Sequence, residues 1–147
     1  MRHELITFGI AGQRFGIDIM IVREIRAWSP VTRLPRVPDY VAGVVNLRGA
    51  VLPVIDLAAR LGWAPTEATP RNPIIVIEYE GQLRGLIVHD VADIVSIETS
   101  SLQQPEGMGQ EGVTHFLSGI APLGEEMVMV LDLVRLMTDD QMLELAA

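Results

Sequence analysis

Short runs of β-branched and aromatic residues, separated by turn-forming residues, dominate the chain. Residues 5–10 and 74–79 are two such runs, and each leads through a Gly-Gln pair into a second apolar run. This order is typical of a β-hairpin, because a tight turn lets two apolar runs pair as antiparallel strands. Residues 51–55 and 127–131 are nearly continuous apolar segments. We therefore expect strands buried on both faces there, with Pro53 at a sheet edge or a bulge.

The chain also resembles itself. Residues 43–57 align without a gap with residues 119–133, with mostly apolar positions opposite apolar positions and five identities in fifteen. Upstream, residues 12–17 align with residues 81–86, so the matched segments occur in the same order in both halves.

These matches predict one domain, residues 1–147, built from two related units at about residues 4–63 and 73–138. Two copies are too few for a solenoid, which needs a longer array to bury a continuous core. A paired architecture of two β units is the better prediction.

Each matched strand ends in an Asp-Leu pair, after which a helical turn is predicted. An Asp at this point can accept hydrogen bonds from the free N–H groups of the first turn, so we interpret Asp56 and Asp132 as N-caps rather than catalytic acids. Residues 138–141 have the pattern of a capping box and predict a short C-terminal helix. Residues 99–112 are polar and Gly-rich, which is typical of a mobile loop.

The turn Asn46-Leu47-Arg48-Gly49 joins two apolar stretches. Asn and Gly are ordinary turn formers and need no functional explanation. Arg48 would project from the tip of a hairpin and present planar donors to a carboxylate or carbonyl group. A solvated arginine without a function is an equally good interpretation, and the matched position in the second unit is Gly124.

Glu24 lies in the apolar run 17–25, whose apolar positions 17, 21, 22 and 25 have the spacing of one helical face. This spacing leaves Glu24 at the margin of the apolar stripe. Its two interpretations are a solvated acid and an acid that faces a partner.

Composition excludes several classes of function. The chain has no cysteine and no lysine, so disulfides, thiolate metal sites and Schiff-base chemistry are absent. A formal net charge of −8 and few aromatic residues argue against nucleic acid as a partner. Neither a secretory signal nor an apolar run of the ~18 residues needed to span a membrane is present, so we expect a cytoplasmic protein.

No set of residues has the spacing of a catalytic or metal site. His3, His89 and His115 form no pair at a metal-ligand spacing, and we expect no metal and no cofactor. An acid–base enzyme using Asp56 or Glu24 is the remaining catalytic alternative. The match of Asp56 with a second Asp speaks for a structural role instead.

With these segments in view, the chain resembles the CheW family over nearly its whole length. The longest matching stretch is Arg33–Gly49, continued by residues 51–57. Further matching segments are Phe15–Asp18, Val22–Ile25, Gly85–Val88 and Val91–Ile94.

The resemblance implies a fold of two intertwined five-stranded barrels of SH3-like or OB-like character that exchange segments. It also implies a non-enzymatic adaptor with two partners: the cytoplasmic tips of methyl-accepting chemoreceptors and the CheW-like regulatory domain of the histidine kinase CheA. The adaptor would lie in the cytoplasm at membrane-bound receptor arrays, without touching the membrane itself. A CheW-like scaffold for a non-flagellar chemosensory kinase system is the alternative.

The resemblance also implies which residues contact each partner. The receptor-binding side would comprise Arg48, Gly49, Ile74 and Gly85. The kinase-binding side would comprise Val22, Glu24, Gly43 and Ile94.

Overall fold

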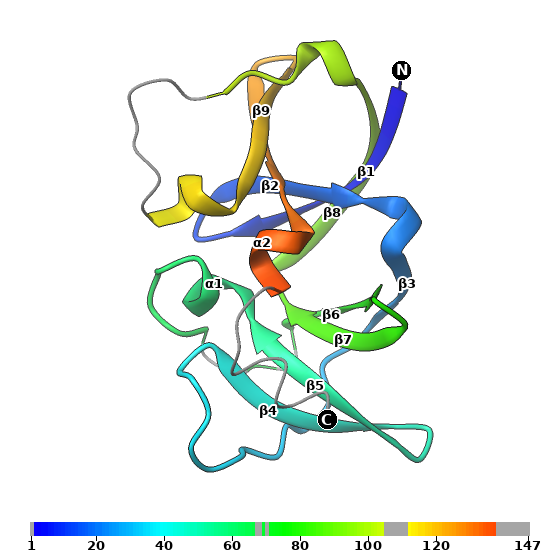
Figure 1. Ribbon diagram of the computed structural model, residues 1–147, viewed down its shortest axis with the longest axis vertical. Helices are drawn as coiled ribbons and strands as arrows, with labels where there is room; N and C mark the ends of the chain where they lie inside the picture. Colours follow the sequence, from blue (N-terminus) through cyan, green and yellow to red (C-terminus); the bar gives the residue numbers. More distant parts are fainter. Residues whose placement is uncertain (1, 67–68, 70, 105–111, 138–147) are drawn as a thin grey trace.

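The chain folds into two five-stranded β-sheets, one above the other in Figure 1. The structure is a computed structural model and describes residues 2–66, 69, 71–104 and 112–137. Sheet A contains β1 (Arg2–Ile10), β2 (Gln13–Asp18), β8 (Asp90–Glu98), β9 (Leu117–Leu123) and β10 (Glu126–Leu131), in the order β8-β1-β2-β10-β9. Sheet B contains β3 (Val22–Arg26), β4 (Val41–Leu47), β5 (Ala50–Asp56), β6 (Ile74–Tyr79) and β7 (Gln82–Ile87), in the order β3-β6-β7-β5-β4. The predicted all-β fold of two five-stranded units is confirmed.

Each sheet takes strands from both halves of the chain. Sheet A combines β1 and β2 with three strands from the second half, and sheet B combines β6 and β7 with three strands from the first half. Two parallel contacts join the halves, β10 beside β2 and β5 beside β7. The sheets are therefore intertwined, as predicted.

The two sheets share one plan. When β1 to β5 are matched in order with β6 to β10, the strand order of sheet A becomes that of sheet B. Gly16 lies beside Val130 in sheet A, and Gly85, its match in the sequence, lies beside Val54, the match of Val130. This agreement in register supports our proposal that the domain consists of two related units.

The helical interpretation of residues 17–25 is wrong. β2 continues to Asp18, a single 3-10 turn covers Ile19–Ile21, and β3 begins at Val22. The Asp18 side chain accepts a hydrogen bond of 2.9 Å from the Met20 N–H and so caps that one turn. Beyond it, β-branched residues favour an extended strand, which places Glu24 on a sheet edge.

The strands β5 and β10 are not buried along their whole length. Val51 is 74 % exposed and Met127 is 51 % exposed, against the expectation. The reason is that β5 pairs with β7 only over Val54–Asp56, so the preceding residues of β5 have a strand on one side only. Pro53 lies just before this pairing, at a local edge where no donor is required of it.

The two matched aspartates have different roles. Helices α1 (Leu57–Arg60) and α2 (Leu133–Met137) follow them as predicted. Asp132 Oδ1 accepts from the Arg135 N–H at 3.3 Å, as expected of a cap. The Asp56 side chain makes no capping hydrogen bond, so that prediction is wrong. Its oxygens instead accept from the backbone N–H and the hydroxyl of Thr66, at 2.6 and 2.7 Å.

Two polar segments are only partly described. In the predicted loop 99–112, Thr99–Ser101 forms a 3-10 turn and Gln103 bridges to Ile120 of β9. Residues 105–111 and the predicted capping box at 138–141 lie outside the described residues.

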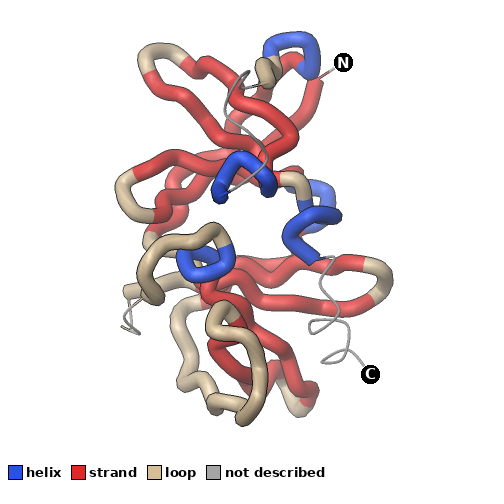
Figure 2. The backbone as a smooth tube through the Cα atoms, turned by 60° about the vertical axis from the view of Figure 1, so that its left-hand side comes forward, coloured by secondary structure: helices blue, strands red, loops and turns tan. Residues whose placement is uncertain are grey.

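One apolar core joins the two sheets. Phe8 and Phe15 of sheet A are buried in the same cluster as Ile75 and Ile77 of sheet B. Helices α1 and α2 lie at the level between the sheets in Figures 1 and 2. This shared core makes the two sheets one packed body.

Arg60 of α1 ties the halves together within this region. Its guanidinium lies 4.5 Å from the ring centre of Tyr40 and 4.6 Å from that of Phe116, which are matched residues of the two halves. Its Nε donates to the carbonyl oxygen of Leu136 in α2 at 3.0 Å. One cation thus binds two aromatic faces and the C-terminal end of the opposite helix.

Candidate binding surface

Arg48 stands at the tip of the β4–β5 hairpin. It and Gly49 are the two central residues of a tight turn, with φ values of 51° and 88°. Two positive φ angles in a two-residue loop match the twist of the strands. The Asn46 side chain accepts from the Gly49 N–H at 2.8 Å and fixes the turn. Holding a residue other than glycine in this conformation costs about 1 kcal/mol.

The structure brings together the two polar residues singled out in the sequence. Glu24 Oε1 lies 3.5 Å from Nη2 of Arg48 and 3.4 Å from Nη1 of Arg26. The Arg48 side chain is 69 % exposed, so this ion pair is screened by water and contributes little to stability. Its effect is to orient Arg48 while most of the guanidinium stays accessible. Sequence reasoning placed these two residues on different sides and missed their contact.

An apolar hollow of about 680 Å³ lies beside the hairpin tip. It forms where β5 and β7 diverge before their pairing begins. Its lining is Leu34, Val44, Leu47, Ala50, Val51, Leu52, Pro53, Gln82, Leu83 and Arg84. Val51 and Leu83 are large apolar side chains exposed at this hollow, and such a surface is typical of a site that another molecule covers.

Arg84 is the unusual residue of this hollow. It is 8 % exposed, and its guanidinium donates to the Leu83 carbonyl oxygen at 2.8 Å and to Gln82 Oε1 at 3.3 Å. Within the described part of the chain no carboxylate lies within ion-pair distance of it. Desolvation lowers the pKa of Arg84 from its ordinary value, which is the effect expected of a cation that leaves water.

Three of the predicted site residues are buried. Ile74 is fully buried, and Gly85 lies next to it, where an added Cβ would be 2.9 Å from Ile74 Cγ2. A Cβ on Gly43, whose φ is 146°, would be 2.1 Å from the Thr32 carbonyl oxygen. These residues therefore shape the sheet from within.

The residues predicted for the kinase side fall in both sheets. Val22 and Glu24 lie on β3, which is an edge strand of sheet B. Ile94 lies on β8, an edge strand of sheet A, and is 56 % exposed. Because β3 and β8 are matched strands, these three residues occupy corresponding edges of the two sheets. Gly43, the fourth predicted residue, lies on β4 at the opposite edge of sheet B, so the set does not form one patch.

Three polar residues form a chain of hydrogen bonds that sequence reasoning did not find. The Thr66 hydroxyl lies 2.7 Å from Asp56 Oδ1 and 3.1 Å from His89 Nε2. His89 Nδ1 accepts from the Ala11 N–H at 3.0 Å, so a neutral ring carries its proton on Nε2 and donates it to Thr66. The imidazole then cannot act as a base toward the hydroxyl, as nucleophilic catalysis would require. The chain is a structural link between the β1–β2 turn and the end of β5.

In the described ranges no three His, Asp or Glu side chains are grouped so as to hold a metal ion. Among the same residues, no helix has both the length and the apolar character needed to cross a lipid bilayer.

Known proteins resemble this chain over most of its length. The sequence model of the CheW-like domain matches residues 4–141. A probable chemotaxis protein CheW of Rhizobium etli is 41 % identical over 138 residues, covering 94 % of this chain and 89 % of that protein. The chemotaxis protein CheW of Rhizobium meliloti is 40 % identical over 130 residues, covering 88 % and 84 %. The crystal structure of the scaffolding protein TtCheW from Thermoanaerobacter tengcongensis superposes with a TM-score of 0.84 at 31 % identity, covering 96 % of both chains.

Proposed function

Since the chain belongs to the CheW family, we propose that it couples chemoreceptors to the histidine kinase CheA as an adaptor that catalyses no reaction. It is a chemotaxis scaffold protein of the CheW type. The proposed partners are the cytoplasmic tips of methyl-accepting chemoreceptors and the CheW-like regulatory domain of CheA. This places its action in the cytoplasm, at receptor arrays.

The observation that carries the receptor contact is the exposed guanidinium of Arg48 beside the apolar hollow. The matched turn position in sheet A is Gly124. The φ of 51° at Arg48 is ordinary for these hairpins, because Ala11 and Glu80 have φ values of 52° and 51° in the β1–β2 and β6–β7 turns. The exposed Arg48 guanidinium and the apolar hollow beside it are suited to an amphipathic helix, whose apolar face would enter the hollow. Gly49 would leave room beside Arg48.

Ile74 and Gly85 would act on receptor binding from beneath. They lie in adjacent strands, β6 and β7, and fix the spacing of the strand that opens the hollow. A larger side chain at position 85 would push against Ile74 and change the shape of the hollow.

For the kinase side we propose the two edge strands. Val22 on β3 and Ile94 on β8 would supply apolar contacts, and Gly43 would keep the backbone of β4 close to Thr32. Glu24 joins this side to the receptor side, because its carboxylate holds Arg48. A change of contact at one side could then alter the other by about 1 to 3 kcal/mol, which is the usual size of coupling between sites.

The receptor contact is tested by replacing Arg48 with Glu. We expect Arg48→Glu to weaken binding of a receptor-tip fragment at least tenfold, or about 1.4 kcal/mol, because a cation becomes an anion beside Glu24. The binding is measured by calorimetric titration, with the urea midpoint as a check that the fold is intact.

The matched control is Glu125→Arg at the tip of the β9–β10 hairpin, which reverses a charge on the other sheet. We expect receptor binding unchanged in this control. Equal affinities of Arg48→Glu and the original chain would contradict the proposed role of Arg48. Binding to a kinase of a non-flagellar system, without affinity for CheA, would favour the alternative partner.

A further inference from the structure

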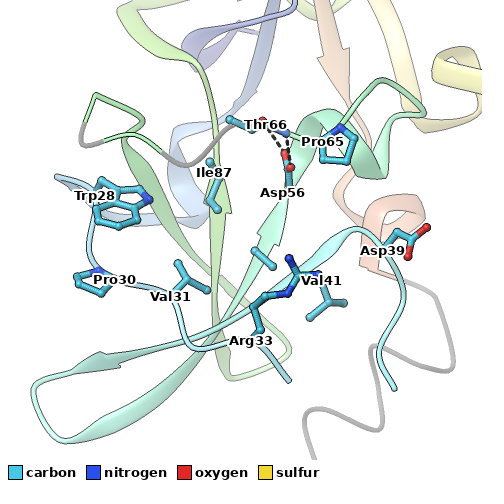
Figure 3. Close-up of a pocket in the computed structure, with 11 residues that line it drawn as sticks. Trp28, Pro30, Val31, Arg33, Asp39, Val41, Asp56, Pro65, Thr66 and Ile87 are labelled. Atoms are coloured by element: carbon cyan, nitrogen blue, oxygen red, sulfur yellow. Dashed lines mark hydrogen bonds between the residues drawn. The ribbon is translucent and has the colours of Figure 1, made fainter. Parts of the chain in front are cut away.

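A second cavity lies away from the hairpin tip, at the ends of the parallel strands β5 and β7. Its volume is about 420 Å³, which is in the range of pockets that hold small molecules. Asp56 and Ile87, which end these two strands side by side, form its inner part. Trp28, Val31 and the other lining residues of the two surrounding loops close it from the sides (Figure 3).

Asp56 supplies a buried carboxylate to this cavity. The residue is 5 % exposed, and of the residues that the structure describes, Thr66 alone donates hydrogen bonds to its two carboxylate oxygens (Figure 3). Among the described residues no cation lies within ion-pair distance of it. A buried carboxylate normally has a cation or several donors as partners, so an ammonium group of a ligand would suit this place.

Trp28 and Arg33 supply hydrogen-bond donors to the same cavity as Asp56. The Trp28 indole Nε1 is buried and has no acceptor within the part of the chain that the structure describes. Buried donors of this kind nearly always have a partner. The Arg33 side chain reaches into the pocket from below in Figure 3, while the carboxyl group of Asp39 is turned outward. Both donors suit the carboxylate of a ligand.

The space between the acid and the donors is apolar. Pro30, Val31, Val41, Ala42 and Ile87 supply its aliphatic lining. We propose that this pocket binds a small zwitterion with an apolar side chain, of the class of free α-amino acids. The ammonium group lies at Asp56, the carboxylate at Trp28 and Arg33, and the side chain against the aliphatic residues. The site is separate from Arg48 and does not depend on the proposed function.

The ligand is tested with the full chain and three probes. L-Leucine carries both charges and an apolar side chain, whereas 3-methylbutylamine lacks the carboxylate and 4-methylpentanoate lacks the ammonium group. We expect L-leucine to bind at least tenfold more tightly than either of the other two, by calorimetry. Its binding should also shift the indole N–H resonance of Trp28 in the NMR spectrum, which a Trp28→Phe variant identifies.

Three variants locate the site. Asp56→Asn, Trp28→Phe and Arg33→Gln should each weaken L-leucine at least tenfold. Arg36→Gln is the matched control and should leave the affinity unchanged, because Arg36 does not line the pocket. If Asp56→Asn does not fold, the two loop variants carry the test.

Several results would overturn the proposal. Absence of L-leucine binding at millimolar concentration overturns the proposal. Binding that leaves the Trp28 resonance in place, or that survives all three substitutions, overturns it as well. Equal affinity for L-leucine and the amine would refute the role of Trp28 and Arg33.

Discussion

The hairpins β4–β5 and β9–β10 have the same place in the two sheets but opposite surface chemistry. The tip of the first carries Arg48 and opens onto an apolar hollow of about 680 Å³. The tip of the second carries Gly124, and the neighbouring hollow of about 190 Å³ is lined by Arg14, Asp93 and Glu126 among others. One backbone plan therefore presents an apolar surface at one end and a charged surface at the other.

The matched acids show the same divergence at the level of single contacts. Glu24 in sheet B binds Arg48, whereas Asp93 in sheet A accepts from the N–H of its own neighbour Ile94 at 3.0 Å. The registers agree on either side of the acids but differ at them, because Glu24 pairs with Val76 whereas the Asp93 backbone bonds to the Thr7 hydroxyl. A protein that holds two different partners needs this combination of a common frame and unlike surfaces.

Substitution of the glycine at the bulge of β4 or of its matched strand β9 gives the largest expected effect on stability. Gly43→Ala would place a Cβ 2.1 Å from a carbonyl oxygen at φ 146°, whereas in Gly119→Ala the nearest atom is 3.2 Å away. We expect Gly43→Ala to lower the free energy of unfolding by about 4 kcal/mol and Gly119→Ala by about 1 kcal/mol. Urea unfolding measures both. Equal losses would show that the two bulges are not differently constrained.

Replacing Arg60 tests the contacts that hold the two halves of the domain together. We expect Arg60→Met to cost about 2 kcal/mol, because two cation–π contacts and a hydrogen bond to α2 are lost while the stem still packs. Arg71→Met, at an exposed loop position, is the control and should change stability by less than about 0.5 kcal/mol. A loss confined to one sheet in hydrogen exchange would contradict a joint role.

A charge introduced at matched positions of β5 and β10 tests whether only the hollow of sheet B binds the receptor. We expect Val51→Glu to weaken receptor-tip binding about tenfold, or about 1.4 kcal/mol, because a charge enters the apolar hollow. Met127→Glu, its match on β10, should leave that binding unchanged. Both side chains are more than half exposed, so neither variant should lose measurable stability. The same effect from both would mean that the hollow of sheet B is not the docking surface.

The sequence predicted what depends on local patterns. The hairpins, the Asn46–Gly49 turn and the two helical turns after Asp56 and Asp132 follow from neighbouring residues, and the structure contains them. The run 17–25 misled because its spacing fits a helical face, while its β-branched residues and the Asp18 cap favour a turn between strands.

What could not be predicted depends on contacts between distant segments. Glu24 meets Arg48 although β3 and β4 are the opposite edge strands of sheet B, and Thr66 links Asp56 with His89 from another part of the chain. The apolar hollow likewise exists only where β5 and β7 diverge. No periodicity along one segment carries this information.

The central claim is that one rigid block with two unlike surfaces joins receptor and kinase. It is tested most directly by sedimenting membranes that display receptor tips together with CheA, with and without this protein. The account predicts that CheA sediments with the membranes only when the protein is present, and that Arg48→Glu lowers the amount of CheA that sediments. Sedimentation of CheA to the same extent without the protein would contradict it.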